Sequence, residues 1–297
     1  MYREYIYLRP KELDEEIKRF PLAFVPLGAL EWHSYHLPLG TDGLKVDFLL
    51  RKTAEKMAKG VLFPTKFWGA FRTMRFPWTF NFPRAGQGRF YRYFLKKLYK
   101  MGFRMIILLT GHYPEGMVRL LKRTCKNFMR SHQDCYVLGI TEYFLLSDFG
   151  YFGDHAARWE TSLEMVANPE HVNLSELPKD YSFIQRAMHL GITGQDPLLT
   201  SSEEEGRNLI EAFSNRLSLL IEKVWEKKNQ QPFLDVYNDY YSKRVQLFKR
   251  KNRDKRLKVL GWDSKKDMWN YLKWLFQNGA RHVKVKDGAL PSDNLGK

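Results

Sequence analysis

Short apolar runs alternate with helical patterns along most of the chain, and this order is what most limits the fold. Strand-like runs cover 22–27, 61–64, 104–110 and 135–140, and helical patterns cover 44–59, 87–102, 116–131 and 204–228. Such alternation is typical of βαβ units, whose right-handed crossovers produce a parallel sheet. We therefore predict an α/β fold in which the carboxyl ends of the strands share one edge of the sheet.

The segment 26–42 follows the first of these runs and concentrates groups that bind metals. Glu31 and His33 lie two residues apart, so both point to one face of an extended chain. Asp42 comes after turn residues that can fold it back toward them. Carboxylates and an imidazole at the end of a strand indicate a divalent-metal site. A polar loop with a satisfied His would show the same residues, so this segment alone leaves both interpretations open.

Two further clusters favour the functional interpretation. Gly111 and His112 follow the run 104–110 directly, ahead of a helical pattern. His155 and Glu160 follow the run 135–140. Their spacing of five is not ideal for one helix face, but a helical turn plus a bend would bring both into one pocket. Three such clusters at strand ends indicate one shared site.

These segments resemble the creatininase (creatinine amidohydrolase) family. Residues 26–42 match its pattern P-x-G-x-x-E-x-H-x-x-H-L-P-x-x-T-D, Gly111-His112 matches its turn, and 155–162 matches H-A-x-x-x-E-T-S. The segment 191–197 is similar to its late G-x-x-G-x-P segment. The matches follow the family order over about residues 5–228. The resemblance implies a three-layer α/β/α sandwich with a mainly parallel sheet, usually assembled into hexamers.

The resemblance also implies a set of metal ligands, with Asp42 in the position that bridges two ions. Creatininase has a metal-binding Glu two places after the turn His, but this chain has Pro114 there. Either Glu115, one residue further on, or Glu160 then completes the site, unless one ion suffices. The candidate ligands are Glu31, His33, Asp42, His112 and Glu160.

Other matched positions would meet the substrate. His155 matches a substrate-contacting His that can shuttle protons, and Glu115 is the second candidate catalytic residue. Tyr113 matches a position that contacts substrate in creatininase. Asp154 is expected to orient His155 or to contact substrate, although Glu160 could orient this His as well.

One departure bears on the choice of substrate. The family's F-P-G-T segment is Phe76-Pro77-Trp78-Thr79 here. The ring of Trp78 would project near the pocket mouth or pack in the core, and we include Trp78 among the substrate-binding candidates. Creatinine itself is therefore not the favoured substrate.

The ligand types predict the chemistry. Mixed carboxylate and imidazole ligands suit one or two ions of Zn²⁺, Mn²⁺ or Fe²⁺. Such an ion lowers the pKa of bound water from about 15.7 toward about 7, and the hydroxide can attack an amide carbonyl. His155 would protonate the leaving nitrogen. We predict hydrolysis of a C–N bond in a small amide, cyclic amide or formamide. A formamidopyrimidine deformylase-like enzyme and a peptidase that processes a cofactor peptide share the motif and stay open.

The charge of the chain suggests a different class of protein. The formal net charge is +16, and residues 231–297 hold 16 Lys and Arg but 7 Asp and Glu. Basic residues with intervening aromatic rings are typical of nucleic-acid surfaces. A basic nucleic-acid-binding protein on an inactive hydrolase fold is therefore an alternative. We favour the enzyme, because charge runs usually belong to solvated faces.

The polar stretch 227–232 ends in Pro and predicts a boundary. We expect a metallohydrolase domain over 1–230 and a basic extension over 231–297. The extension should contain an amphipathic helix over 264–276, capped by Ser264 and docked on the main domain or a neighbouring subunit. Residues 289–297 are expected to form a loose tail.

Cysteine content and hydropathy predict the location. The two cysteines, Cys125 and Cys135, show no metal-type spacing and are too few for a disulfide framework. Residues 1–20 lack the apolar stretch of a signal peptide, and no apolar run approaches the ~20 residues that span a bilayer. We therefore expect a cytoplasmic protein with buried thiols and no membrane contact.

Overall fold

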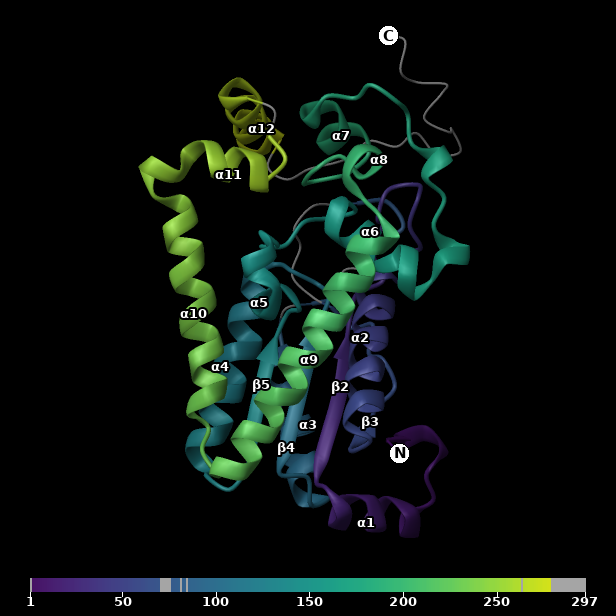
Figure 1. Cartoon of the computed structure of the whole chain (residues 1–297), viewed down its shortest axis with the longest axis vertical. Coiled ribbons are helices and arrows are strands. Elements are labelled where there is room, and N and C mark those ends of the chain that lie inside the picture. The colour runs from purple at the N-terminus through teal and green to yellow at the C-terminus, as the bar shows by residue number, and fades with distance from the viewer. Residues whose placement is uncertain (1, 70–75, 81, 84, 263, 279–297) are drawn as a thin grey trace.

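A five-stranded sheet in the order β1-β3-β2-β4-β5 forms the centre of the computed structural model (Figure 1). The structure describes residues 2–69, 76–80, 82–83, 85–262 and 264–278. All neighbouring strands pair in parallel. The strands are β1 (Arg3–Glu4), β2 (Leu22–Leu27), β3 (Val61–Leu62), β4 (Met105–Thr110) and β5 (Tyr136–Ile140). The predicted α/β fold is confirmed, and the short β1 is the one strand here that the sequence pattern did not predict.

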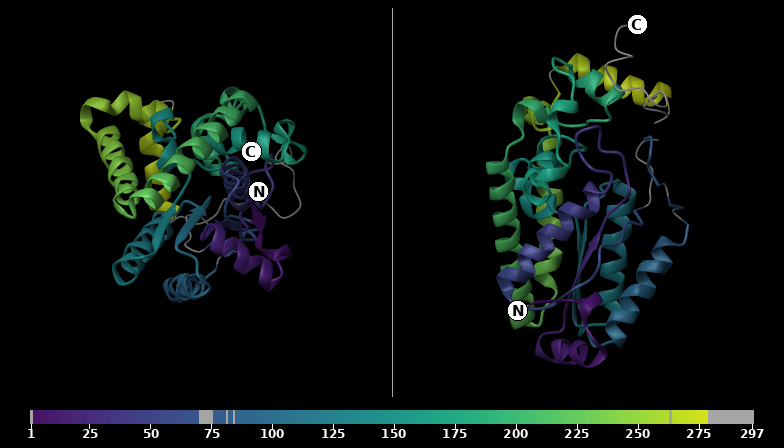
Figure 2. Two further views of the ribbon diagram at one scale, coloured as in Figure 1. Left: turned by 60° about the horizontal axis from the view of Figure 1, so that its bottom comes forward. Right: turned by 90° about the vertical axis from the view of Figure 1, so that its right-hand side faces the viewer.

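Helices cover both faces of the sheet because successive residues of a buried strand point to opposite sides. Leu22 and Phe24 of β2 pack in one apolar cluster with α2 (Thr41–Met57) and α9 (Glu203–Lys227). Ala23 and Val25 pack in a second cluster with α3 (Gln87–Lys100) and α4 (Glu115–Ser131). The right-hand view of Figure 2 shows the sheet nearly edge-on, with helices on both of its sides. The result is the expected three-layer α/β/α arrangement.

Shorter helices gather at the carboxyl end of the sheet, above it in Figure 1. They connect β5 to the long helix α9 and provide the loops that approach the strand ends. At the opposite end, α1 (Pro10–Arg19) precedes β2. The upper helices are α5 (Tyr143–Leu146), α6 (Arg158–Ala167), α7 (Phe183–His189) and α8 (Pro197–Thr200).

The C-terminal region forms α10 (Gln231–Phe248), α11 (Arg253–Val259) and α12 (Lys265–Asn278). The Tyr237 hydroxyl of α10 bonds to both the N–H and the C=O of Gly139 in β5, at 3.1 and 3.0 Å, so α10 is attached directly to the central sheet. Ser264 caps α12 by accepting from the Asp267 N–H at 3.1 Å, as predicted. The expected tail over 289–297 lies outside the described residues.

Both cysteines, Cys125 and Cys135, are buried free thiols. Burial raises the pKa of Cys135 to about 12, so its thiol stays protonated near neutrality. Among the described helices, none is both long enough and apolar enough to cross a membrane.

Candidate metal centre and substrate cleft

The candidate metal ligands, called the metal-binding cluster below, converge on the carboxyl edge of the sheet from four separate segments. The loop after β2 carries Glu31 and His33, and the turn after β4 carries His112. Asp42 lies in the first turn of α2, and Glu160 lies in the first turn of α6. Parallel strands bring these segments together, although more than a hundred residues separate the first from the last.

Glu31, Asp42 and His112 form one group that could hold a metal ion. The His112 Nδ1 atom lies 3.0 Å from Glu31 Oε2 and 3.0 Å from Asp42 Oδ2. Burial opposes a charge on His112, but the two carboxylates outweigh it and raise its pKa to about 10. A cation is therefore strongly favoured between these two carboxylates.

His33, Asp42 and Glu160 form a second group, with Asp42 shared. His33 Nδ1 lies 2.9 Å from the Glu31 carbonyl, which only accepts, so this nitrogen must donate. Its Nε2 atom then lies 3.3 Å from Asp42 Oδ1 and 3.5 Å from Glu160 Oε2 and has no hydrogen-bond partner. Burial disfavours the imidazolium, yet Asp42 and Glu160 raise the pKa of His33 to about 9.

This arrangement fits a metal ion because the converging atoms carry lone pairs. In the neutral ring, His33 Nε2 faces two carboxylate oxygens and can donate to neither, so a proton or a metal ion must neutralise the contact. Asp42 presents Oδ2 to the first group and Oδ1 to the second. Asp42 is therefore the carboxylate that the two groups share.

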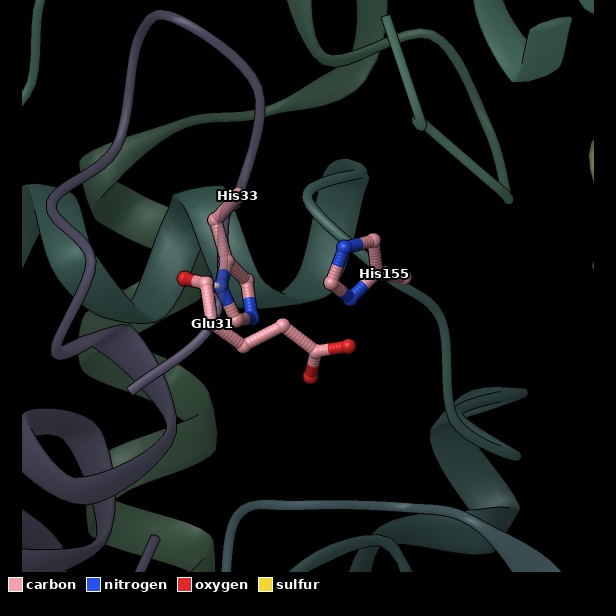
Figure 3. Close-up of side chains that lie close together, drawn as sticks. All are labelled: Glu31, His33 and His155. Atoms are coloured by element: carbon pink, nitrogen blue, oxygen red, sulfur yellow. Dashed lines mark hydrogen bonds between the residues drawn. The ribbon is translucent and has the colours of Figure 1, made fainter. Parts of the chain in front are cut away.

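His155 completes a third group with Glu31 and His33, and the three side chains approach one another in Figure 3. Its Nε2 lies 3.0 Å from the carbonyl oxygen of Trp32 and must donate to it, which leaves Nδ1 as an acceptor. Phe76 stacks on the ring at 4.7 Å between centroids. Burial, with the nearby His33, lowers the pKa of His155. His155 is therefore a neutral base held in a fixed orientation.

Lys45 and Glu142 belong to the same cluster, and sequence analysis missed both. Lys45 is 1% exposed; its ammonium donates to Glu160 and lies 3.6 Å from Glu142 Oε1 and 3.8 Å from Asp42 Oδ1. Burial opposes the ammonium, but Glu160, Glu142 and Asp42 together raise its pKa. Lys45 lies three residues after Asp42 on α2, so one helix delivers a carboxylate and a fixed cation to the cluster.

The side chain of Tyr113 lies against this cluster and contacts Lys45 and Glu142. Its hydroxyl donates to Glu142, and its ring lies 4.3 Å from Lys45 Nζ. Tyr151 also donates to Glu142, at 2.9 Å. Burial and these contacts fix the position of the Glu142 carboxyl. Because Tyr113 donates to this carboxyl, the side chain of Tyr113 is also fixed beside the metal-binding groups.

A cavity of about 440 Å³ opens onto the cluster. His33 and Glu160 are not among its described lining residues and lie behind it, fully buried. The cavity therefore reaches the Glu31–Asp42–His112 group from outside. Its inner wall consists of Glu31, Asp42, His112, Tyr113, Asp154 and His155.

Two of the predicted site residues lie outside the candidate metal-binding groups. Glu115 is at the rim of the cavity, paired with Arg119 at 2.6 Å, and is not part of any metal-binding group found among the described residues. It is the first residue of α4. Trp78 is 55% exposed and contacts the buried Trp32 edge-on. It is not among the described residues that line the cavity. Glu160 rather than Glu115 joins His33 and Asp42.

His36 contacts the helix that carries Glu160 without belonging to a candidate metal-binding group among the described residues. Its Nε2 lies 2.9 Å from the Thr161 hydroxyl, next to Glu160. Burial and the positive potential of His33 lower the pKa of His36 to about 3, so the ring stays neutral. Asp154 accepts from the Trp159 N–H at 2.8 Å, and burial beside Glu160 raises its pKa well above the ordinary value.

Solved structures of known proteins share the fold of this chain. A creatininase structure shares 19% identity with the chain, covers 75% of it and 97% of its own length, and has a TM-score of 0.58. A Bacteroides fragilis protein described as a creatinine amidohydrolase shares 22% identity over 74% of this chain and 95% of its own, with a TM-score of 0.57. These likenesses establish the fold. No curated protein matches the chain significantly.

A sequence model of one family covers most of the chain. The family described as "Creatininase: Creatinine amidohydrolase" matches residues 7–221, a span that contains every metal-binding residue named above. The order of its segments, the parallel sheet and the converging carboxylates and imidazoles agree with that match. The chain belongs to the creatininase family.

Proposed function

We propose that this protein is a metal-dependent hydrolase that cleaves a C–N bond in a small amide, cyclic amide or formamide. The observation that carries the proposal is the shared Asp42, whose two oxygens meet His112 on one side and His33 on the other. Family membership supports hydrolysis of C–N bonds. Relatives include creatininase structures titled as an Mn form and as a Zn–Zn type, which supports Mn²⁺ or Zn²⁺ here.

In this proposal one ion binds to Glu31, Asp42 and His112, the group that the cavity reaches. A bound ion would supply a water of lowered pKa and polarise the amide carbonyl. Glu31 and Asp42 hold the negative charge that attracts the ion, and both side chains are buried. Lys45 supplies a permanent positive charge to the second group.

His155 has the geometry of a proton carrier. Its Nε2–H is tied to Trp32, so Nδ1 alone is free to take a proton and to pass it to the leaving nitrogen. The lowered pKa of His155 keeps Nδ1 unprotonated before the reaction begins. Stacking against Phe76 restricts the ring to this task. Tyr113 and Asp154 line the cavity beside His155 and are positioned to contact substrate.

The test combines metal content with a product screen. The purified protein should contain a divalent metal by elemental analysis and should release amine or ammonia from at least one of a set of lactams, formamides and short peptides. Asp42→Asn should lose both metal and activity, because both groups share this side chain. Lys52→Gln, an exposed change on the same helix, is the matched control. A protein that binds no metal would favour the inactive fold instead.

The class of product distinguishes the related activities. Formate release would indicate a deformylase, and release of amino acids from short peptides would indicate a peptidase. The hexameric assembly and the cytoplasmic location stay predictions from family resemblance and cysteine content. Sedimentation of the purified protein and fractionation of cells test them.

A further inference from the structure

The cavity over the metal-binding cluster has an outer wall that comes from the C-terminal region. The family match ends at residue 221, and about a quarter of this chain lies outside the creatininase structure that matches almost over its full length. Helices α10, α11 and α12 all follow that end. In Figure 1, α10 rises beside α4, and α11 and α12 extend from its upper end toward α7. The cavity-lining residues of these helices and of the turn between α11 and α12 include Tyr240, Tyr241, Arg244, Leu260, Trp262 and Tyr271.

This outer wall is firmly attached to the metallohydrolase domain. Tyr240 is 2% exposed and stacks on Phe144 at 4.0 Å. Tyr271 of α12 packs edge-on against Phe183 of α7 at 5.5 Å. Gly261 has a φ of +72°, and a Cβ there would lie 2.1 Å from the Gly194 carbonyl oxygen. The turn between α11 and α12 therefore lies directly against a loop that lines the inner wall.

A row of aromatic rings leads from the metal-binding cluster to this outer wall. Tyr113, beside Lys45, lies 5.1 Å from Tyr143 between ring centroids, and Tyr143 lies 5.2 Å from Tyr240. Arg244 follows Tyr240 by four residues, so both lie on one face of α10. Flat apolar groups of a substrate would fit along this row, with Arg244 at its far end.

Arg244 carries the only permanent positive charge among the described residues that line the cavity. Its Nη1 reaches Glu115 Oε1 only at 3.5 Å, whereas Arg119 already pairs with that carboxylate at 2.6 Å. Most donors of the Arg244 guanidinium are thus available. A guanidinium fork matches one carboxylate well. A phosphate dianion would suffer more from the neighbouring acids Glu31, Asp42 and Glu115.

We propose that the C-terminal region forms the outer substrate subsite, and that Arg244 selects amides that carry a flat ring and a free carboxylate. This inference rests on the proposed function for the fate of the amide bond. The binding preference rests only on the cavity and its charge. The added helices thereby give this chain a specificity that the family-matched segment does not encode.

Binding of two matched probes to the purified, metal-containing protein tests the inference. In 4-acetamidobenzoate a flat ring separates the amide from the carboxylate, and 4-acetamidobenzamide has the same shape without the charge. Calorimetry should show that 4-acetamidobenzoate binds at least ~10-fold more tightly, since a charged hydrogen-bonded pair contributes about that much. 4-Acetamidophenylphosphonate should bind more weakly than 4-acetamidobenzoate. Equal affinity of the protein for 4-acetamidobenzoate and 4-acetamidobenzamide, or no binding of either, would overturn the inference.

Arg244→Gln should abolish the preference by weakening the binding of 4-acetamidobenzoate alone, with the binding of 4-acetamidobenzamide unchanged. Lys243→Gln removes the same charge one residue away, where the lysine pairs with Asp239 at 2.7 Å, and should keep the preference. A preference that persists in Arg244→Gln would show that the metal-binding cluster holds the carboxylate, and would overturn the assignment. Preference without hydrolysis of either probe would count against the proposed function alone.

Discussion

The ammonium of Lys45 donates a hydrogen bond to Glu160 inside the metal-binding cluster, and it lies 3.8 Å from Asp42 Oδ1. Both carboxylates belong to the group that contains His33. Two unit charges 4 Å apart repel by about 4 kcal/mol at an effective dielectric constant of 20, so a divalent ion beside Lys45 faces roughly twice that. Lys45 therefore occupies the electrostatic position of a second metal ion.

From this relationship we predict one metal ion per chain in the native protein and two in Lys45→Met. Methionine keeps the length of the side chain and removes its charge, so the His33–Asp42–Glu160 group becomes free to bind an ion. Elemental analysis after dialysis against metal-containing buffer measures the ratio. Lys52→Met, which removes an exposed charge from the same helix, should still bind one ion. Two ions in the native protein would contradict the role of Lys45.

Metal binding should release protons and strengthen as the pH rises. Without metal, burial opposes the charged rings, but the carboxylates raise the pKa of His33 to about 9 and of His112 to about 10. At neutral pH the His112 imidazole must lose a proton before its lone pair can bind the ion. Calorimetry in two buffers of different ionisation enthalpy measures this release. No proton release at pH 7 would contradict the predicted charge of His112.

The same pKa values predict how the stability of the metal-free protein depends on pH. A raised folded-state pKa means that the folded protein binds the proton more tightly than the unfolded chain does. The stabilisation of the folded state by the protonated His33 and His112 is complete below the ordinary His pKa of about 6.5. It is lost as the pH rises through 9 and 10. Urea unfolding of metal-free protein at pH 6.5 and 9.5 should show the lower free energy at pH 9.5. The opposite order would contradict the assignment.

The turn before His112 requires a glycine at position 111. A Cβ at this position would lie 2.0 Å from the Asp42 carbonyl oxygen. Gly111→Ala must therefore displace the first turn of α2, which carries Asp42. We expect a loss of metal affinity of at least ~10-fold and a destabilisation of about 1–3 kcal/mol. Isothermal titration with Mn²⁺ and urea unfolding measure these changes.

A glycine elsewhere provides the control for Gly111. Gly88 lies in α3, where an added Cβ would approach the flexible end of Leu120 at 3.2 Å. Gly88→Ala should leave metal affinity unchanged and stability nearly so, because alanine favours a helix. Equal metal affinity in both variants would mean that Gly111 does not position Asp42.

Local patterns predicted the scaffold well and the charge network poorly. The run 104–110 and the helical pattern 116–131 correspond to β4 and α4 within one residue, since apolar periodicity is a property of neighbouring residues. Glu31, His33 and Asp42 could be found because a family pattern holds them in one segment. Lys45 could not, because its acidic partner Glu160 lies 115 residues away and a lysine near a helix start is usually solvated.

The C-terminal region shows the same limit. The sequence predicted its helix at Ser264 correctly. It did not predict that Arg244 would line a cavity shared with Glu31, because that contact depends on how α10 packs against β5. Tertiary packing, rather than composition, determines which basic residues face the cleft.

Within this cluster, we expect replacement of Glu142 to lower the free energy of unfolding most. It is completely buried, accepts from the hydroxyls of Tyr113 and Tyr151, and lies 3.6 Å from Lys45 Nζ. Glu142→Leu would leave two hydroxyls without an acceptor and Lys45 with less negative charge around it. We expect a loss of about 3–5 kcal/mol in the free energy of unfolding, measured in urea. Glu142→Gln keeps a carbonyl acceptor for the hydroxyls and should lose only about 1–2 kcal/mol. Equal losses in the two variants would mean that packing, and not the hydrogen bonds of Glu142, holds Tyr113 against the metal-binding cluster.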